Sequence, residues 1–177
     1  TDAGADVLKL GLCGTEEMYW AVTQFGACAG IEVTASHNPI NYNGIKVVKS
    51  DSQPLDSFSD FQKIKMLAEI ESWAPALSKG IIEDISAVGR KKYVEKCLRF
   101  VKVASLKPLR IVVNCGNGAA GPTFDAIAKA LVDRRAPLKF IRVHHEPDHT
   151  FPNGIPNPLL PQNHSATGNV VLSESAD

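Results

Sequence analysis

The run Thr34–Pro39 (T-A-S-H-N-P) combines residue types that suit phosphoryl transfer. Ser36 offers a small hydroxyl nucleophile, and His37 offers an imidazole that titrates near neutral pH. Lys46 follows the serine by ten residues and supplies a cation. A serine that carries a phosphoryl group has about two negative charges and needs positive charge nearby. Ser36, His37 and Lys46 are therefore residue types that a phosphoserine site needs, whereas a serine in a turn before a proline is, taken alone, most often only a turn residue.

Two strands and a helix are expected to position this serine. Strands are predicted at 31–33 and 45–48, and the proline and asparagines of 37–43 predict an open loop between them. Thr15 is expected to cap a short helix with two acidic residues in its first turn, where acids suit the helix dipole. The serine would therefore lie on a loop that follows a strand.

Two further helices are predicted by apolar residues at helical spacing. The residues are Phe61, Ile64, Leu67 and Ile70 in the first, and Tyr93, Val94, Cys97, Leu98 and Val101 in the second. Residues 73–80, which include a proline, are expected to connect these helices. Ser105–Pro108 is the predicted domain boundary, so that residues 1–104 form a first domain with the serine loop and residues 105–177 a second.

The second domain is predicted to contain a strand–helix–strand unit with parallel strands at 109–114 and 138–143. Residues 116–121 are expected to form a glycine-rich turn, and Pro122 suits the first position of the helix. A last helix is expected at 169–175. The predicted fold class is therefore α/β, with layered domains of mixed or mainly parallel sheet flanked by helices.

The glycine-rich turn allows more than one interpretation. Gly116, Gly118 and Gly121 have the G-x-G-x-x-G spacing between a strand and a helix, which suits a structural turn, a phosphate contact or a nicotinamide dinucleotide site. No acid lies about 20 residues further on, as the dinucleotide site would need, and a structural turn is favoured. Metal-ligand types also cluster after the second strand, at spacing that fits no standard motif: His144, His145, Asp148 and His149.

Composition narrows the classes of partner. The 177 residues include 44% hydrophobic ones, and 19 basic residues balance 19 acidic ones, which gives no reason to expect nucleic acid or an anionic membrane. No apolar run reaches the roughly 18 residues of a membrane span. Four cysteines without CxxC spacing favour free thiols, so a cytoplasmic protein is expected.

Several segments, in order along nearly the whole chain, resemble the alpha-D-phosphohexomutases, the phosphomannomutase and phosphoglucomutase family. In that family the serine of T-A-S-H-N-P is the phosphorylated catalytic residue. The other segments that carry the resemblance are Gly11–Glu17, Gly30–Val33, Tyr42–Lys46, Asn114–Pro122 and Phe151–Leu159. Leu160-Pro161-Gln162 departs from the family's L-P-E and weakens any role for a carboxylate there.

The resemblance implies an isomerase that acts as an intramolecular phosphotransferase. It would interconvert hexose 1-phosphate and hexose 6-phosphate, with mannose and/or glucose as the sugar and hexose 1,6-bisphosphate as intermediate and activator. Ser36 would carry the phosphate and bind Mg²⁺ through it, so Ser36 is also the expected metal-binding residue. Lys46 would be the general acid/base or charge partner, and His37 would orient the phosphate or share proton transfer. The partner implied is a small-molecule sugar phosphate.

The family's D-G-D-x-D-R metal loop, its N-terminal arginine and its third and fourth domains are not found in the sequence. We therefore expect the chain to correspond to most of the family's domains one and two, and to be inactive alone. Three alternatives remain open: a non-catalytic sugar-phosphate binding module, a phosphoglucosamine mutase, and a metal-dependent phosphatase that uses Ser36 as nucleophile.

Overall fold

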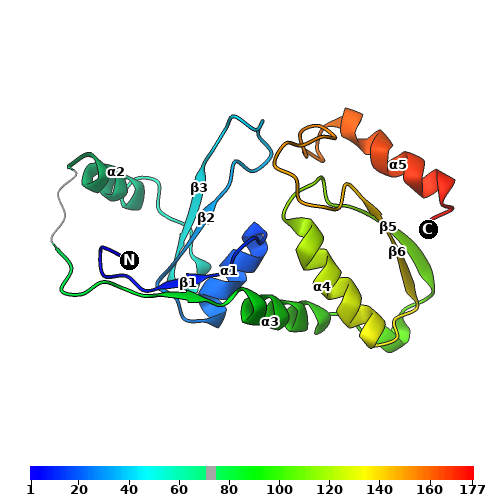
Figure 1. Cartoon of the computed structure of the whole chain (residues 1–177), viewed down its shortest axis with the longest axis horizontal. Helices are drawn as coiled ribbons and strands as arrows, with labels where there is room; N and C mark the ends of the chain where they lie inside the picture. Colours follow the sequence, from blue (N-terminus) through cyan, green and yellow to red (C-terminus); the bar gives the residue numbers. More distant parts are fainter. Residues whose placement is uncertain (71–74) are drawn as a thin grey trace. The chain divides into compact units, whose positions relative to one another are not determined.

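A computed structural model describes residues 1–70 and 75–177 of the chain (Figure 1). Contacts divide them into two compact units: Thr1–Glu32 with Lys46–Gly89 (the first unit), and Val33–Ile45 with Arg90–Asp177 (the second unit). The domain boundary at 104/105 stays a prediction. Residues 73 and 74 of the predicted connection lie outside the described residues.

Helix α1 (Thr15–Gln24) packs its apolar side against the strand pair β2 (Ala29–Val33) and β3 (Ile45–Lys49). The buried residues of this core are Met18, Val22 and Val48. A Cβ atom at Gly30 would overlap side chains of this core, so β2 approaches α1 as closely as only glycine allows. Both strands lie where the sequence predicts them, and the loop between them is the one that carries Ser36.

The start of α1 differs from the prediction. Gly14 precedes the helix in an extended conformation, and no side chain caps the helix. Thr15 is instead the first helical residue, and its hydroxyl accepts a hydrogen bond from Lys46 Nζ at 2.8 Å. Its hydroxyl is held by this contact with β3, so the prediction of a Thr15 cap was wrong.

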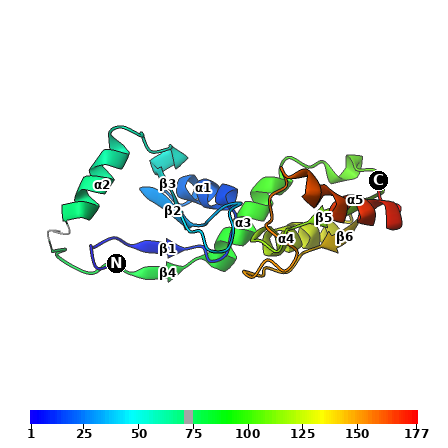
Figure 2. The same cartoon turned by 90° about the horizontal axis from the view of Figure 1, so that it is seen from above.

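The first unit also contains a second strand pair and a helix. Strands β1 (Val7–Lys9) and β4 (Ile82–Asp84) pair in parallel (Figure 2). Helix α2 (Asp60–Ile70) forms where the apolar spacing predicts it. However, the four apolar residues that predicted the helix are all about half exposed, from 46% for Leu67 to 56% for Ile70. The spacing therefore predicted the helix correctly but did not mark a buried face.

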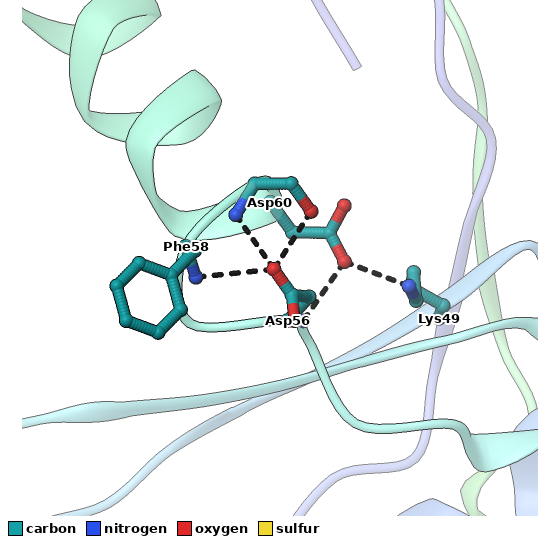
Figure 3. Close-up of polar contacts among 5 residues, drawn as sticks. Lys49, Asp56, Phe58 and Asp60 are labelled. Atoms are coloured by element: carbon teal, nitrogen blue, oxygen red, sulfur yellow. Dashed lines mark hydrogen bonds and ion pairs between the residues drawn. The ribbon is translucent and has the colours of Figure 1, made fainter.

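Polar contacts tie the start of α2 to β3 (Figure 3). Asp60 Oδ2 accepts a hydrogen bond from Lys49 Nζ at 2.7 Å and one from the Asp56 N–H at 2.9 Å. Asp56 Oδ1 accepts the N–H groups of Phe58 and Ser59 at 3.1 and 2.6 Å. The bonds from Ser59 hold the pKa of Asp56 below its usual range, and the Lys49 ammonium does the same for the pKa of Asp60. These contacts stabilise the charged carboxylates.

In the second unit, β5 (Leu109–Asn114) and β6 (Leu138–Val143) pair in parallel along their whole length and are joined by α4 (Ala120–Asp133). Both strands have the predicted bounds, and the predicted parallel pairing is confirmed. Helix α5 (His164–Ser173) begins five residues earlier than predicted and contacts β5. The α/β fold class is confirmed.

The core of this unit joins α4, β6 and the end of α3 (Ser86–Leu98). Its buried residues are Val94, Leu98 and Leu131. Helix α4 begins at Ala120, so Gly121 lies inside the helix rather than in the preceding turn, and Pro122 is not its first residue, which corrects the predicted start. Proline is tolerated there because the first N–H groups of a helix have no partner within it. None of the helices in the described ranges is long and apolar enough to cross a bilayer.

Candidate active site

The loop of residues 34–44 joins β2 to β3 and carries the candidate serine. The Thr34 N–H donates to the Gly44 carbonyl at 2.9 Å and closes the base of the loop. A Cβ atom at Gly44 would lie 2.9 Å from the Thr34 carbonyl oxygen, closer than side chains tolerate. The Gly44 N–H donates to Asn43 Oδ1 at 2.8 Å. The sequence Asn43-Gly44 thus allows the loop to close tightly below Ser36.

Ser36 has a left-handed backbone, with φ of 55°. Its N–H donates to Thr34 Oγ1 at 3.0 Å. On the other side, the Asn38 N–H and Nδ2 both donate to the Ala35 carbonyl, at 3.2 and 2.7 Å. Left-handed conformations are uncommon for residues other than glycine and are found where the surroundings enforce them. Asn38 thus bonds to the backbone of its own turn.

The side chains of Ser36 and His37 are exposed at the tip of this turn. Among residues 1–70 and 75–177, neither the Ser36 hydroxyl nor the His37 imidazole makes a hydrogen bond. Both groups are therefore available to a ligand.

Lys46, the third predicted residue, is half-buried on β3 in the first unit. Its ammonium donates to Thr15 Oγ1 at 2.8 Å, at the start of α1. The structure thus brings Ser36 and His37 together in one turn, and it brings Lys46 to Thr15. The sequence singled out the segment that contains Thr15 but not this contact, because the two residues are separated by 31 positions.

A second polar turn follows β5 and has a similar backbone. The Gly116 N–H donates to Asn114 Oδ1 at 2.9 Å, and Asn117 has a left-handed backbone with φ of 56°. Unlike Ser36, Asn117 is fully bonded: its N–H and Nδ2 donate to the carbonyls of His144 and Glu146, at 2.7 and 2.9 Å. Its carbonyl and Oδ1 accept hydrogen bonds from the Asp148 N–H and from Asn153 Nδ2, each at 2.9 Å. Sequence reasoning named this segment but missed the role of Asn117.

Packing explains two glycines of this turn. A Cβ atom at Gly116 would lie 2.6 Å from the Pro156 Cβ, and one at Gly121 would overlap the His145 carbonyl oxygen. Both positions require glycine, because another segment of the chain lies too close for a side chain. Gly121 belongs to α4. Packing therefore gives Gly116 and Gly121 a structural role, in line with the favoured interpretation of a structural turn.

A cysteine, a histidine and an aspartate form a chain of polar contacts beside this turn. Cys115 Sγ lies 3.4 Å from His145 Nδ1, and His145 Nε2 lies 2.9 Å from Asp125 Oδ2. Arg142 also donates to Asp125, from Nε at 2.9 Å. His145 and, next, Arg142 hold the pKa of Asp125 below its usual range. Burial raises the pKa of the Cys115 thiol, and the Asp125 charge adds to this, which favours the protonated thiol.

The described residues do not make a metal site by themselves. Residues 1–70 and 75–177 contain no group of three histidine, cysteine, aspartate or glutamate side chains that could hold a metal ion. His145, from the cluster that the sequence singled out, is bonded to Asp125. For Mg²⁺, which prefers oxygen ligands, the turn at Ser36 offers the serine oxygen rather than a full ligand set.

Comparison with known proteins places this loop in a family. The family described as phosphoglucomutase/phosphomannomutase, alpha/beta/alpha domain I, matches residues 1–73, and its domain II matches residues 91–177. The chain belongs to the phosphoglucomutase/phosphomannomutase family. Its expected relation to the phosphohexomutases is therefore confirmed.

Relatives agree with this membership. The chain is 46% identical to a phosphomannomutase of Salmonella montevideo, over 99% of the chain and 39% of that protein. It is 42% identical to a Xanthomonas campestris protein named phosphohexose mutases, over 99% of the chain and 38% of that protein. A crystal structure of a phosphoglucomutase/phosphomannomutase family protein from Burkholderia thailandensis covers 99% of the chain with a TM-score of 0.77 and 26% identity, over 37% of its own length. The chain thus spans less than half the length of these relatives.

Proposed function

We propose that the protein is a phosphohexomutase that interconverts mannose 1-phosphate and 6-phosphate, glucose phosphates, or both, through a phosphate on Ser36. The observation that carries the proposal is the exposed Ser36 hydroxyl, which has no hydrogen bond among the described residues and stands on a turn with φ of 55°. Relatives named phosphomannomutase support the reaction class. The partner is then a small-molecule sugar phosphate.

The proposed reaction has two balanced halves. Phosphoserine at Ser36 transfers its phosphoryl group to the free hydroxyl of a hexose phosphate, so that the P–Oγ bond breaks and a new P–O bond forms. The hydroxyl proton passes to a base of the protein. The resulting hexose 1,6-bisphosphate reorients in the site. The P–O bond between its other phosphoryl group and the sugar then breaks, the phosphoryl group returns to the Ser36 oxygen, and the sugar oxygen takes the proton back from the base. Free hexose 1,6-bisphosphate also loads the unphosphorylated serine and acts as activator.

Two side chains are proposed to assist the transfer. Lys46 acts as general acid/base or as charge partner of the phosphoserine, and its hydrogen bond to Thr15 fixes the position of its ammonium. His37, exposed beside the serine, orients the phosphate or shares proton transfer. Neither Lys46 nor His37 is buried in the core, so both side chains can take these roles.

Mg²⁺ is the proposed cofactor, and it would neutralise charge on the phosphate when bound. Ser36 would offer its oxygen to the ion. The described residues contain no group of three histidine, cysteine, aspartate or glutamate side chains that could hold it. We therefore propose that residues 1–177 by themselves do not complete turnover. A cytoplasmic location is proposed as well, and four free cysteines support a reducing compartment.

The test is conversion of mannose 1-phosphate and of glucose 1-phosphate by the complete protein that carries this sequence, with Mg²⁺ and glucose 1,6-bisphosphate. Ser36→Ala removes the nucleophile and is expected to lower kcat on the order of 10⁴-fold. Ser57→Ala, at another exposed serine in a turn, is the matched control and should leave kcat unchanged. Reversible sugar-phosphate binding without conversion in the parent protein would overturn the proposal in favour of a binding module. Net release of phosphate would favour a phosphatase.

A further inference from the structure

The left-handed backbone of Ser36 needs a restraint, because a φ of 55° is energetically unfavourable for a serine. The N–H of Ser36 lies on the Thr34 side of the residue, and this N–H is the group whose direction φ sets. Thr34 Oγ1 accepts it at 3.0 Å. When a threonine hydroxyl accepts the N–H of the residue two positions later, the backbone forms a compact local turn. This turn is an alternative to extended or helical backbone.

Thr34 is itself held in place. Its own N–H donates to the Gly44 carbonyl at 2.9 Å, and the side chain is half-buried, whereas Ser36 is exposed. The close approach of Gly44 to the Thr34 carbonyl oxygen keeps the two sides of the loop together. Thr34 therefore links the closed base of the loop to the backbone of the serine at its tip.

We propose that Thr34 is a positioning residue that sets the direction of the Ser36 side chain through the hydrogen bond from the Ser36 N–H to its hydroxyl. The inference rests on the proposed function, because it concerns the same serine. It has a further consequence: the Ser36 N–H is already bonded to Thr34, so the phosphate on Ser36 must be held by other donors. The bond also leaves the hydroxyl hydrogen of Thr34 free to donate to a phosphate oxygen.

The test compares Thr34→Val with Thr34→Ser in the complete protein. Valine keeps the shape of threonine but accepts no hydrogen bond, whereas serine keeps the acceptor. Thr167→Val is the matched control, since Thr167 Oγ1 accepts a hydrogen bond of similar length, 2.9 Å, from Asn114 in the second unit. Two readouts are taken: the hydrogen-exchange rate of the Ser36 amide, and the rate at which glucose 1,6-bisphosphate with Mg²⁺ phosphorylates Ser36.

Thr34→Val is expected to speed exchange of the Ser36 amide and to slow phosphorylation and kcat about tenfold, with KM changed less than about twofold. Thr34→Ser should restore both rates, and Thr167→Val should alter neither. Circular dichroism and the unfolding midpoint identify a folding defect. If Thr34→Val does not fold, Thr34→Ala takes its place with the same expectation.

The outcomes separate the two claims. If the parent protein is phosphorylated on Ser36 and Thr34→Val matches it in both rates, the inference is overturned while the proposed function stands. If the Ser36 amide of the parent is protected from exchange but the Ser36 side chain is never phosphorylated, the proposed function fails. The positioning role of Thr34 in catalysis then fails with it. A slow Thr34→Val that Thr34→Ser does not rescue shows that a hydroxyl acceptor at this position does not by itself set the rate, and also overturns the inference.

Discussion

The serine loop of residues 34–44 and the turn at residues 114–121 have similar backbone conformations. They differ in how far their side chains are engaged in hydrogen bonds. Each follows a strand, and each contains a left-handed residue that is not glycine, Ser36 or Asn117. In each, a side chain accepts an N–H from two residues later: Thr34 from Ser36, and Asn114 from Gly116. The Asn117 side chain is then consumed by hydrogen bonds, whereas the Ser36 hydroxyl has none among the described residues.

This difference separates a structural turn from a reactive one. Backbone strain alone does not indicate function, since both turns have it. What distinguishes the serine loop is that its restraints come from the backbone and from Thr34 and Asn38, so the tip stays exposed. Substitutions in or beside the serine loop should therefore change catalysis with little effect on stability, and substitutions in the turn at 114–121 should do the opposite.

After loss of the Ser36 nucleophile, the largest expected effect concerns Lys46, which follows the serine loop in the sequence. Lys46→Met keeps the length of the side chain but removes the charge and the hydrogen bond to Thr15. We expect kcat to fall about 100-fold with little change in the unfolding midpoint. Lys129→Met removes an exposed lysine from α4 and is the control, which should leave kcat unchanged. An equal kcat in parent and Lys46→Met would remove Lys46 from the mechanism.

Gly121→Ala tests the structural turn next. The added Cβ would overlap the His145 carbonyl oxygen, so we expect the free energy of unfolding to fall by about 1–3 kcal/mol. Gly168→Ala in α5 has open space around the Cβ and should stabilise by about 0.5–1 kcal/mol. Urea unfolding measures both. A stable Gly121→Ala protein with strongly reduced kcat would show that the turn takes part in catalysis.

Asn117→Ala has a somewhat smaller expected cost. It removes the two side-chain hydrogen bonds that join the turn to the carbonyl of Glu146 and to Asn153. We expect a loss of about 1–2 kcal/mol in the free energy of unfolding and an unchanged kcat for the folded protein. Asn169→Ala, at an exposed position of α5, should cost far less. If kcat drops while the unfolding midpoint stays, the contrast between the two regions is lost.

The smallest effect is a pH dependence at Asp125. Because His145 and Arg142 lower its folded-state pKa, Asp125 stabilises the fold above its unfolded pKa of about 3.9, and this is lost as pH falls through the lower folded value. The side chain is 49% exposed, so the contribution should stay below about 1 kcal/mol. Asp125→Asn should be less stable than the parent at pH 6, and the gap should close towards pH 2. A gap that is constant across this range would contradict the assignment.

The sequence predicts the regular elements of the second unit well because local pattern and tertiary structure agree there. The β-branched residues of 109–114 and 138–143 form the strands with the predicted bounds. The prediction fails where contacts with residues distant in the sequence, or their absence among the described residues, determine the role of a side chain. Thr15 looked like a cap, but Lys46 takes its hydroxyl, and α2 has helical apolar spacing without a buried face.

The candidate site shows the same limit. Ser36, His37 and Lys46 could be named from residue type, spacing and family resemblance. Their backbone and hydrogen bonds could not, because the φ of Ser36 depends on Thr34, Asn38 and the closure by Gly44 together. The Cys115–His145–Asp125 line was also missed, since contacts over 20 and 30 positions leave no periodic signal in the sequence.

The most direct test of the central claim is tandem mass spectrometry of the purified protein after incubation with glucose 1,6-bisphosphate and Mg²⁺. The left-handed turn and its exposed, unbonded hydroxyl predict phosphate on Ser36, and none on the exposed Ser57. Ser36→Ala should abolish the modified peptide. Phosphate at another serine, or none at all in a protein that interconverts hexose phosphates, would contradict the claim that the loop at 34–44 is the reactive one.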